Sequence, residues 1–133
     1  MLQQLVPLRP PCKEARRIWR LGFCDDLALA RGDGRHPRLI KSIGRADLLI
    51  LDDFGLEPLD AGARHDLLEI VEERYGRRST IVTSQLPLSA WHEVVGDPTY
   101  ADAIQDRLIH NAHRIELTGE SLRRTRGKQP KTA

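Results

Sequence analysis

The chain has 133 residues, of which 40% are hydrophobic and 30% are charged, and this suits one small globular domain. Its net charge of +2 permits contact with nucleic acid without requiring it, and the positive charge gathers in residues 13–20 and 123–131. The two cysteines, Cys12 and Cys24, lack metal-ligand spacing and a cluster of histidine partners, so we expect free thiols in a reducing compartment and no structural zinc. Prolines interrupt the apolar residues of 1–11, so we expect no signal peptide or membrane span and a cytoplasmic protein.

The first part of the chain gives weak structural signals. Residues 1–12 have no clear period and three prolines, so we expect them to be irregular, whereas residues 13–21 suit a short basic helix. Residues 25–31 have helical composition, with acids at the start and a Gly-Asp-Gly stop. Residues 37–43 place apolar side chains at helical spacing before Gly44.

A strand that ends in two carboxylates is the most informative feature. Residues 48–51 are apolar without alternation, which is typical of a parallel strand covered on both faces, and Asp52 and Asp53 follow directly. Open α/β sheets bind ligands at this end of their strands. In P-loop NTPases such a strand is the Walker B element, so the pattern assigns Asp52 to Mg²⁺, held through water, and Asp53 to the attacking water. The alternative is an Asp-rich turn without a ligand.

A helix and a second strand follow the carboxylates. Asp60 is suited to cap a helix over 60–78, which has an apolar stripe on one face. Residues 79–85 form a β-branched run that ends in polar side chains. A right-handed βαβ unit places both polar strand ends on one edge, so we expect Gln85 to lie near Asp52 and Asp53.

The last elements are shorter. We expect a short helix over 88–95, an amphipathic helix over 101–111 and a strand over 113–117, followed by a basic, polar end from Gly119.

A phosphate cradle is absent from these residues. A P-loop needs G-x-x-x-x-G-K-[ST], because its backbone N–H groups and lysine hold the phosphates. The chain contains no Gly-Lys-Ser or Gly-Lys-Thr, and Gly127-Lys128 is followed by Gln129. The sequence therefore carries the metal half of a nucleotide site without the phosphate half.

Several motifs, in one order, carry a family resemblance. From about residue 28 to 124 the chain resembles the IstB-like transposition helper ATPases, which are related to the DnaC helicase loaders of the AAA+ superfamily. The motifs are ARGDGR at 30–35, LILDDFGL at 49–56, RRSTIVTSQLP at 77–87, WH at 91–92, GDPT at 96–99, DRLIHNAHRIEL at 106–117 and GESLR at 119–123.

The resemblance implies a fold, a site and partners. The fold would be the three-layer αβα sandwich of a P-loop NTPase with a parallel sheet, here lacking the P-loop strand. ATP and Mg²⁺ would be the cofactors, and a transposase, DNA and further copies in an oligomer would be the partners. The implied site residues are the Walker B pair Asp52 and Asp53, the arginine finger Arg107 for a neighbouring subunit, and the sensor-2-like Arg123. Sensor 1 would be the polar strand end Thr83-Ser84-Gln85, acting chiefly through Gln85.

The departures from the family define the expected domains. Residues 1–24 do not follow the family pattern, residues 25–122 form a partial AAA+ domain, and residues 123–133 form a basic tail. In the AAA+ sheet the P-loop strand lies between the sensor-1 strand and the last strand, so its loss would open a slot there. We expect a truncated copy that hydrolyses no ATP alone; the alternatives are a non-catalytic DNA- or partner-binding module and a decayed transposon remnant.

Other readings of single residues stay open. Arg107 can equally be a helix-surface residue paired with Asp106 or Glu116. The scattered histidines suit surface or core positions better than a metal site, and Trp91 suits packing against the sheet. The basic tail can contact DNA phosphates or remain solvated.

Overall fold

The computed structural model describes residues 2–5, 15–110 and 112–119 of the chain. They form a five-stranded sheet in the order β2-β3-β4-β1-β5. The strands are β1 (Leu2–Leu5), β2 (Ala15–Trp19), β3 (Leu48–Asp52), β4 (Ser79–Ser84) and β5 (His113–Glu116). The helices are α1 (Arg20–Asp33), α2 (His36–Arg45), α3 (Ala61–Arg74), the 3₁₀ turn η1 (Leu88–Ala90), α4 (Trp91–Val95) and α5 (Pro98–Ile109).

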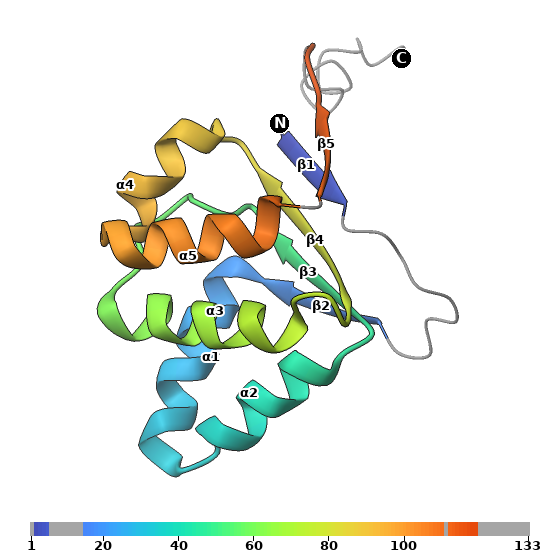
Figure 1. The fold of residues 1–133 in the computed structure, drawn as a ribbon. Helices are drawn as coiled ribbons and strands as arrows, with labels where there is room; N and C mark the ends of the chain where they lie inside the picture. The colour runs from blue at the N-terminus through green and yellow to red at the C-terminus, as the bar shows by residue number, and fades with distance from the viewer. Residues whose placement is uncertain (1, 6–14, 111, 120–133) are drawn as a thin grey trace, which may run out of the picture.

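The helices lie together on one face of the sheet (Figure 1). Strands β2, β3 and β4 are parallel and adjacent in chain order, so both crossovers step in the same direction. Right-handed crossovers that step in one direction place their helices on the same face. The prediction of an α/β fold with a parallel sheet is therefore confirmed, whereas the described residues contain no helical layer on the opposite face.

Burial along β3 reflects this one-sided cover. Leu49 and Leu51 are buried under the helices, but Leu48 and Ile50 are only half-buried. Successive side chains of a strand point to opposite faces, so the two half-buried residues share the face without helices. The expectation that this strand is covered on both faces is wrong for the described residues.

The first strand corrects the expectation of an irregular N-terminal segment. Residues Leu2–Leu5 form β1, which pairs antiparallel with β4 on one side and β5 on the other. It fills the position between these two strands, where the sequence predicted an open slot. The pairing joins residues about 80 positions apart in the chain, for example Leu5 with Ile81, and local sequence patterns cannot reveal such a partner.

The predicted basic helix over 13–21 is also wrong. Residues Ala15–Trp19 form β2, which pairs in parallel with all of β3 from Leu48 to Asp52, and α1 begins only at Arg20. An exposed β3 edge offers unpaired N–H and C=O groups, and satisfying them outweighs a weak helical preference.

Helix α3 anchors the helical layer. Asp60 accepts a hydrogen bond from the Ala63 N–H, as the predicted cap requires, and Leu67, Ile70 and Val71 are buried in the core. Figure 1 shows α3 between α2 and α5. The helix thus ties β3 and β4, which carry the candidate site, to the rest of the core.

A buried arginine, Arg74, joins the C-terminal end of α2 to the start of β4. The Arg74 guanidinium donates to the carbonyl oxygens of Ile43 (3.0 Å) and Ala46 (2.5 Å) and to Thr80 Oγ1 (3.0 Å). It also donates to the Ser79 carbonyl. Burial lowers the pKa of Arg74 to about 10, so the side chain stays charged at neutral pH and serves the C-terminal carbonyls of α2.

Among the described residues, none of the helices has the length and apolar content needed to cross a lipid bilayer.

Candidate functional site

The two carboxylates at the end of β3 are joined to β4 through one hydroxyl group. Thr83 Oγ1 donates to Asp52 Oδ1 at 2.6 Å and accepts from the Asp53 N–H at 2.9 Å. Both aspartates are half-buried and Thr83 is buried, with 9% of its surface exposed. Because the hydroxyl accepts from one neighbour and donates to the other, it fixes both the Asp52 carboxylate and the backbone of Asp53.

Asp53 has an unusual backbone conformation. Its φ of 54° is in the left-handed region, and it is the only non-glycine residue with positive φ among the described residues. Gly55 follows with a φ of 93°, and a Cβ there would lie 2.9 Å from Leu86 Cδ1. The chain therefore turns sharply behind the carboxylates, and it holds Asp53 in a conformation that costs free energy for an L-residue.

The turn is fastened to the end of β4 by further hydrogen bonds. The Phe54 N–H donates to the Thr83 carbonyl at 2.8 Å, and Ser84 Oγ donates to the Phe54 carbonyl at 2.7 Å. The Leu86 N–H in turn donates to Ser84 Oγ at 3.1 Å. Ser84 is fully buried, so in this structure its hydroxyl stabilises the turn and does not face solvent.

The resemblance placed sensor 1 chiefly at Gln85, two residues past Thr83, which makes the observed contact. Gln85 follows β4, is exposed, and forms no hydrogen bond with the described residues. Thr83 lies beside Asp52 because Leu51 pairs with Val82 in the parallel register. The polar ends of β3 and β4 thus meet as expected, but the contact with Asp52 is made by Thr83. Residues 83, 84 and 85 are all polar, and only the pairing of β4 with β3 shows which of them meets Asp52.

Arg107, the predicted arginine finger, is bound to α3. Its guanidinium lies 3.3 Å from Glu72 Oε1 and also donates to the Ala103 carbonyl at 3.2 Å. Asp106, one of the alternative partners, is 4.0 Å away. Arg123, the sensor-2-like residue, lies outside the described residues.

The aromatic residue beside the turn belongs to the core. Trp91 is 1% exposed, and its ring centroid lies 4.7 Å from that of Phe54 at an interplanar angle of 59°. This confirms that Trp91 packs against the sheet, and it joins the turn after the carboxylates to α4.

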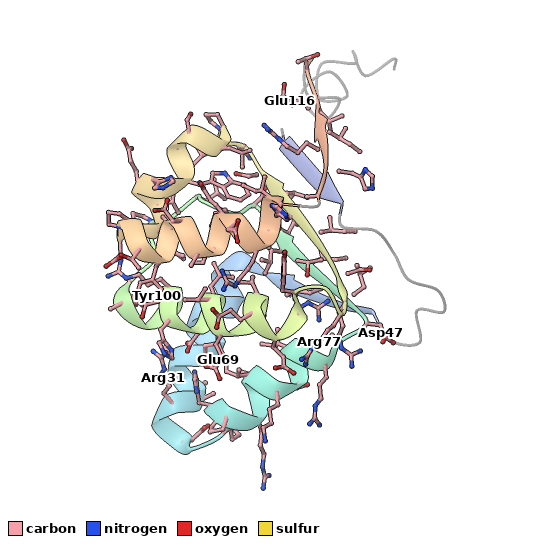
Figure 2. The ribbon with its side chains drawn as sticks, viewed as in Figure 1. Arg31, Asp47, Glu69, Arg77, Tyr100 and Glu116 are labelled. Carbon is pink, nitrogen blue, oxygen red and sulfur yellow. The ribbon has the colours of Figure 1, made fainter. Side chains whose placement is uncertain are left out.

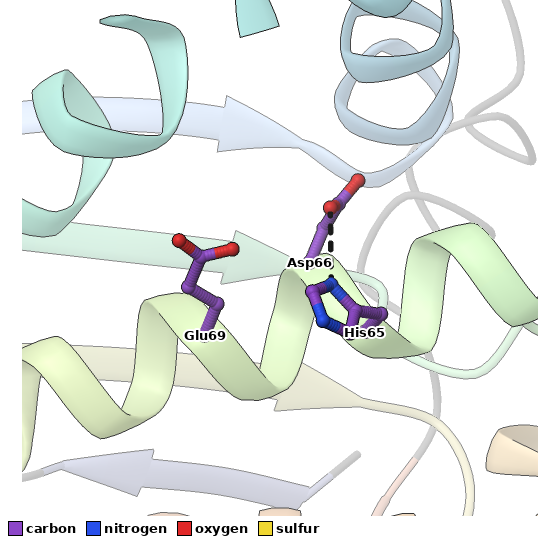
Figure 3. A group of neighbouring side chains, drawn as sticks. All are labelled: His65, Asp66 and Glu69. Atoms are coloured by element: carbon purple, nitrogen blue, oxygen red, sulfur yellow. Dashed lines mark ion pairs between the residues drawn. The ribbon is translucent and has the colours of Figure 1, made fainter. Parts of the chain in front are cut away.

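A second group of polar side chains lies on α3, away from the carboxylate pair. Potential ligand atoms of His65, Asp66 and Glu69 all lie within 4.8 Å of one another, as Figure 3 shows. However, Asp66 Oδ1 already lies 2.6 Å from Arg31 Nη2 and 3.0 Å from His36 Nε2. A metal ion bound to this oxygen would have to displace or repel the guanidinium. The buried Asp66 carboxylate therefore acts as an ion-pair partner that joins Arg31 of α1 to α3.

Comparison with known protein families identifies the family to which this sequence is similar. The family described as IstB-like ATP binding protein matches residues 18–130, which is most of the chain. The match includes the carboxylate pair, Thr83 and both predicted arginines. The chain belongs to the IstB-like ATP-binding protein family.

Individual relatives in this family share the same region. A protein of Sinorhizobium fredii named as an insertion sequence ATP-binding protein, y4pL, is 71% identical over 104 residues, which are 78% of this chain and 42% of the relative. Another from the same organism, y4uH, is 63% identical over 75% of this chain and 40% of the relative. A relative from Bacillus thuringiensis, named as the insertion sequence IS232 ATP-binding protein, is 34% identical over 74% of this chain and 39% of its own length.

The chain therefore spans about two fifths of the length of these IstB-like relatives. The family name refers to ATP binding, and the region shared with the relatives includes the carboxylate pair at the end of β3.

Proposed function

We propose that Asp52, Thr83 and Asp53 form the metal- and water-binding half of an ATP site in an IstB-like helper of DNA transposition. The observation that carries the proposal is the hydroxyl bridge, in which Thr83 Oγ1 contacts both the Asp52 carboxylate and the Asp53 N–H. The bridge fixes the Asp52 carboxylate and the backbone of Asp53 at the carboxyl end of parallel strands, where α/β sheets bind ligands.

The residues present suit Mg²⁺. This ion prefers oxygen ligands, keeps several of its waters, and in nucleotide sites is held by one or two carboxylates together with phosphate oxygens. Bound there, Mg²⁺ would offset the negative charge of the phosphates. Asp52 would hold the ion through water, and Asp53 would accept a hydrogen bond from the water that attacks the γ-phosphate.

The remaining site residues complete the proposal. Gln85, being exposed beside the pair, is free to contact a phosphate or the attacking water, and Ser84 acts by supporting the turn. Arg107 serves a nucleotide on a neighbouring subunit only after leaving Glu72, a change that costs little because both side chains are partly exposed. Arg123 supplies a further positive charge from the same chain.

The proposed architecture and partners follow the family. A domain over 25–122, with a basic tail over 123–133 and a distinct segment over 1–24, would work in a cytoplasmic oligomer with a transposase and DNA. In the assembled protein the face of the sheet that carries Leu48 and Ile50 would be covered by a second helical layer, giving the three-layer sandwich of P-loop NTPases.

A second candidate function rests on the missing phosphate cradle. The 133 residues contain no Gly-Lys-Ser or Gly-Lys-Thr, and β1 occupies the position between β4 and β5. A chain of this kind would act as a non-catalytic module that joins oligomers of intact relatives. On either proposal we expect no ATP hydrolysis by the chain alone.

Binding of Mn²⁺ with ATP separates the two functions. Mn²⁺ replaces Mg²⁺ at oxygen sites, and its binding is measured by electron paramagnetic resonance. For the metal half-site, we expect the purified chain to bind Mn·ATP and the Asp52→Asn variant to bind about tenfold more weakly, which corresponds to about 1.4 kcal/mol.

Asp102→Asn is the matched control, since it removes one carboxylate from the exposed side of α5. It should bind Mn·ATP like the parent chain. Equal binding by the parent and Asp52→Asn, with both showing a cooperative melt by circular dichroism, would reject the half-site in favour of the interaction module.

A further inference from the structure

Helix α2 presents a row of positive side chains to solvent. Arg38, Lys41 and Arg45 are exposed, while Ile40 and Ile43 on the opposite side are buried. Spacings of three and four residues place the three cations within about 60° of arc around the helix, along about 10 Å of its axis. We call these three residues the α2 basic stripe.

Among the described residues, no acidic side chain forms an ion pair with the α2 basic stripe. None of its three side chains forms a hydrogen bond or ion pair with the described residues. The stretch 34–46 contains four arginine or lysine residues and no acid, in a chain whose net charge is only +2. The acids that flank α2 in sequence are each paired with another arginine, Asp33 with Arg35 and Asp47 with Arg78, and Glu73, which lies against Gly44 of α2, lies 3.9 Å from Arg77.

The surroundings of the stripe can be followed in the side-chain view. Figure 2 shows Asp47 and Arg77 beside the C-terminal end of α2, from whose outer side nitrogen-tipped side chains extend away from α3. Because the three stripe side chains are exposed and form no ion pair with the described residues, their positive charge is available to another molecule.

The dipole of α2 does not explain the stripe. Basic residues near a helix C-terminus are favoured by the dipole, and this accounts for Arg45. Arg38 is the third residue of the helix, where the partial positive charge of the free N–H groups opposes a cation. An unpaired arginine at this position gains stability only when an anion binds beside it, at the helix end that favours anions.

We propose that the α2 basic stripe contacts the phosphate backbone of double-stranded DNA. Duplex DNA carries one negative charge per about 1.7 Å of its axis, so a row of three cations along about 10 Å can contact several phosphates. Proteins that grip single strands add aromatic side chains on which bases stack. Residues 34–47 contain no Phe, Tyr or Trp, and His36 is occupied with Asp66 at 3.0 Å.

This inference rests on DNA as a partner in the proposed function, and it makes the contact independent of base sequence. The test is equilibrium binding of the full chain to a fluorescent 20-base-pair duplex at several salt concentrations. Each phosphate contact contributes about −0.9 to the slope of log K against log salt. The triple variant Arg38→Gln, Lys41→Gln, Arg45→Gln should therefore have a slope about 2.7 less negative than the parent.

Glutamine keeps the helical preference of the parent residues, so α2 should fold unchanged in the variant, as a circular-dichroism melt will show. Two controls remove positive charge elsewhere. Arg114→Gln, on exposed β5, is matched in charge to the single variants Arg38→Gln, Lys41→Gln and Arg45→Gln, each of which should have a slope about 0.9 less negative than the parent. A triple Arg123→Gln, Arg124→Gln, Arg126→Gln variant is matched to the triple stripe variant.

We expect the slope to be reduced more in the folded triple stripe variant than in the triple 123–126 variant, and more in each single stripe variant than in Arg114→Gln. The stripe assignment is overturned if that variant keeps the parent slope, if the 123–126 variant alone accounts for the loss, or if single-stranded DNA or double-stranded RNA binds more tightly than the duplex. A parent chain that binds no duplex also overturns it. Loss of Mn·ATP binding in Asp52→Asn is a separate result, so failure of the stripe does not imply failure of the nucleotide half-site.

Discussion

Replacing Thr83 by valine tests the hydroxyl bridge with little change in side-chain volume. The substitution removes the acceptor of the Asp53 N–H and the donor to Asp52 Oδ1, while the fold of β4 and its β-branched side chain are preserved. Any effect therefore reports on the two hydrogen bonds and not on a cavity.

The expected loss follows from the partners left behind. A neutral hydrogen bond contributes about 1 kcal/mol net to stability, and one to a charged group contributes about 1.5–3 kcal/mol. Asp52 and Asp53 are half-buried, so water replaces part of each bond. The two contributions sum to about 2.5–4 kcal/mol, and partial solvation favours the lower part of this range. We therefore expect Thr83→Val to lower the free energy of unfolding by about 2.5–3 kcal/mol.

Urea unfolding followed by circular dichroism measures this loss. Thr83→Ser is the matched control, since it keeps the hydroxyl and removes only a methyl group that contributes about 1 kcal/mol. The loss in free energy of unfolding for Thr83→Ser should be less than half of the loss for Thr83→Val. A loss below about 0.5 kcal/mol for Thr83→Val, or an equal loss for both variants, would show that the bridge does not hold the carboxylates in place.

Two further substitutions test the strained turn and the buried cation. Asp53→Gly should be about 1 kcal/mol more stable than Asp53→Ala in urea unfolding, because a φ of 54° strains a residue with a Cβ; an alanine variant of equal or greater stability would contradict strain at this turn. Arg74→Met should lower the free energy of unfolding by about 3 kcal/mol, since it removes the guanidinium donor from the carbonyls of Ile43 and Ala46 and from Thr80 Oγ1. A thermal melt of Arg74→Met that matches the parent would mean that water satisfies those carbonyls.

Local patterns predicted the elements that lie close together in the chain. The strand before Asp52, the helix capped by Asp60 and the strand that begins at Ser79 were all expected, because apolar period, capping residue and β-branched content act within a few residues. The same βαβ reasoning correctly brought the polar end of the second strand to the carboxylates.

The prediction of site residues was less complete, for a reason of register. Thr83, Ser84 and Gln85 are consecutive polar residues, and their side chains alternate between faces of the sheet. Which of them meets Asp52 depends on the pairing of Leu51 with Val82, which is set by packing of the two strands against the core. The roles assigned to Gln85, Arg107 and Arg123 stay predictions.

By itself, the sequence determined the acidic strand end, the absence of a phosphate cradle and the family, since each depends on residue identity and order. Only the tertiary structure decided that β1 lies between β4 and β5, that β2 borders β3, and that Thr83 bridges the carboxylates. These features join residues that are about 30 to 110 positions apart in the chain. Their free energy comes from satisfying strand edges and burying side chains, which depend on the arrangement of the whole sheet and not on any local pattern.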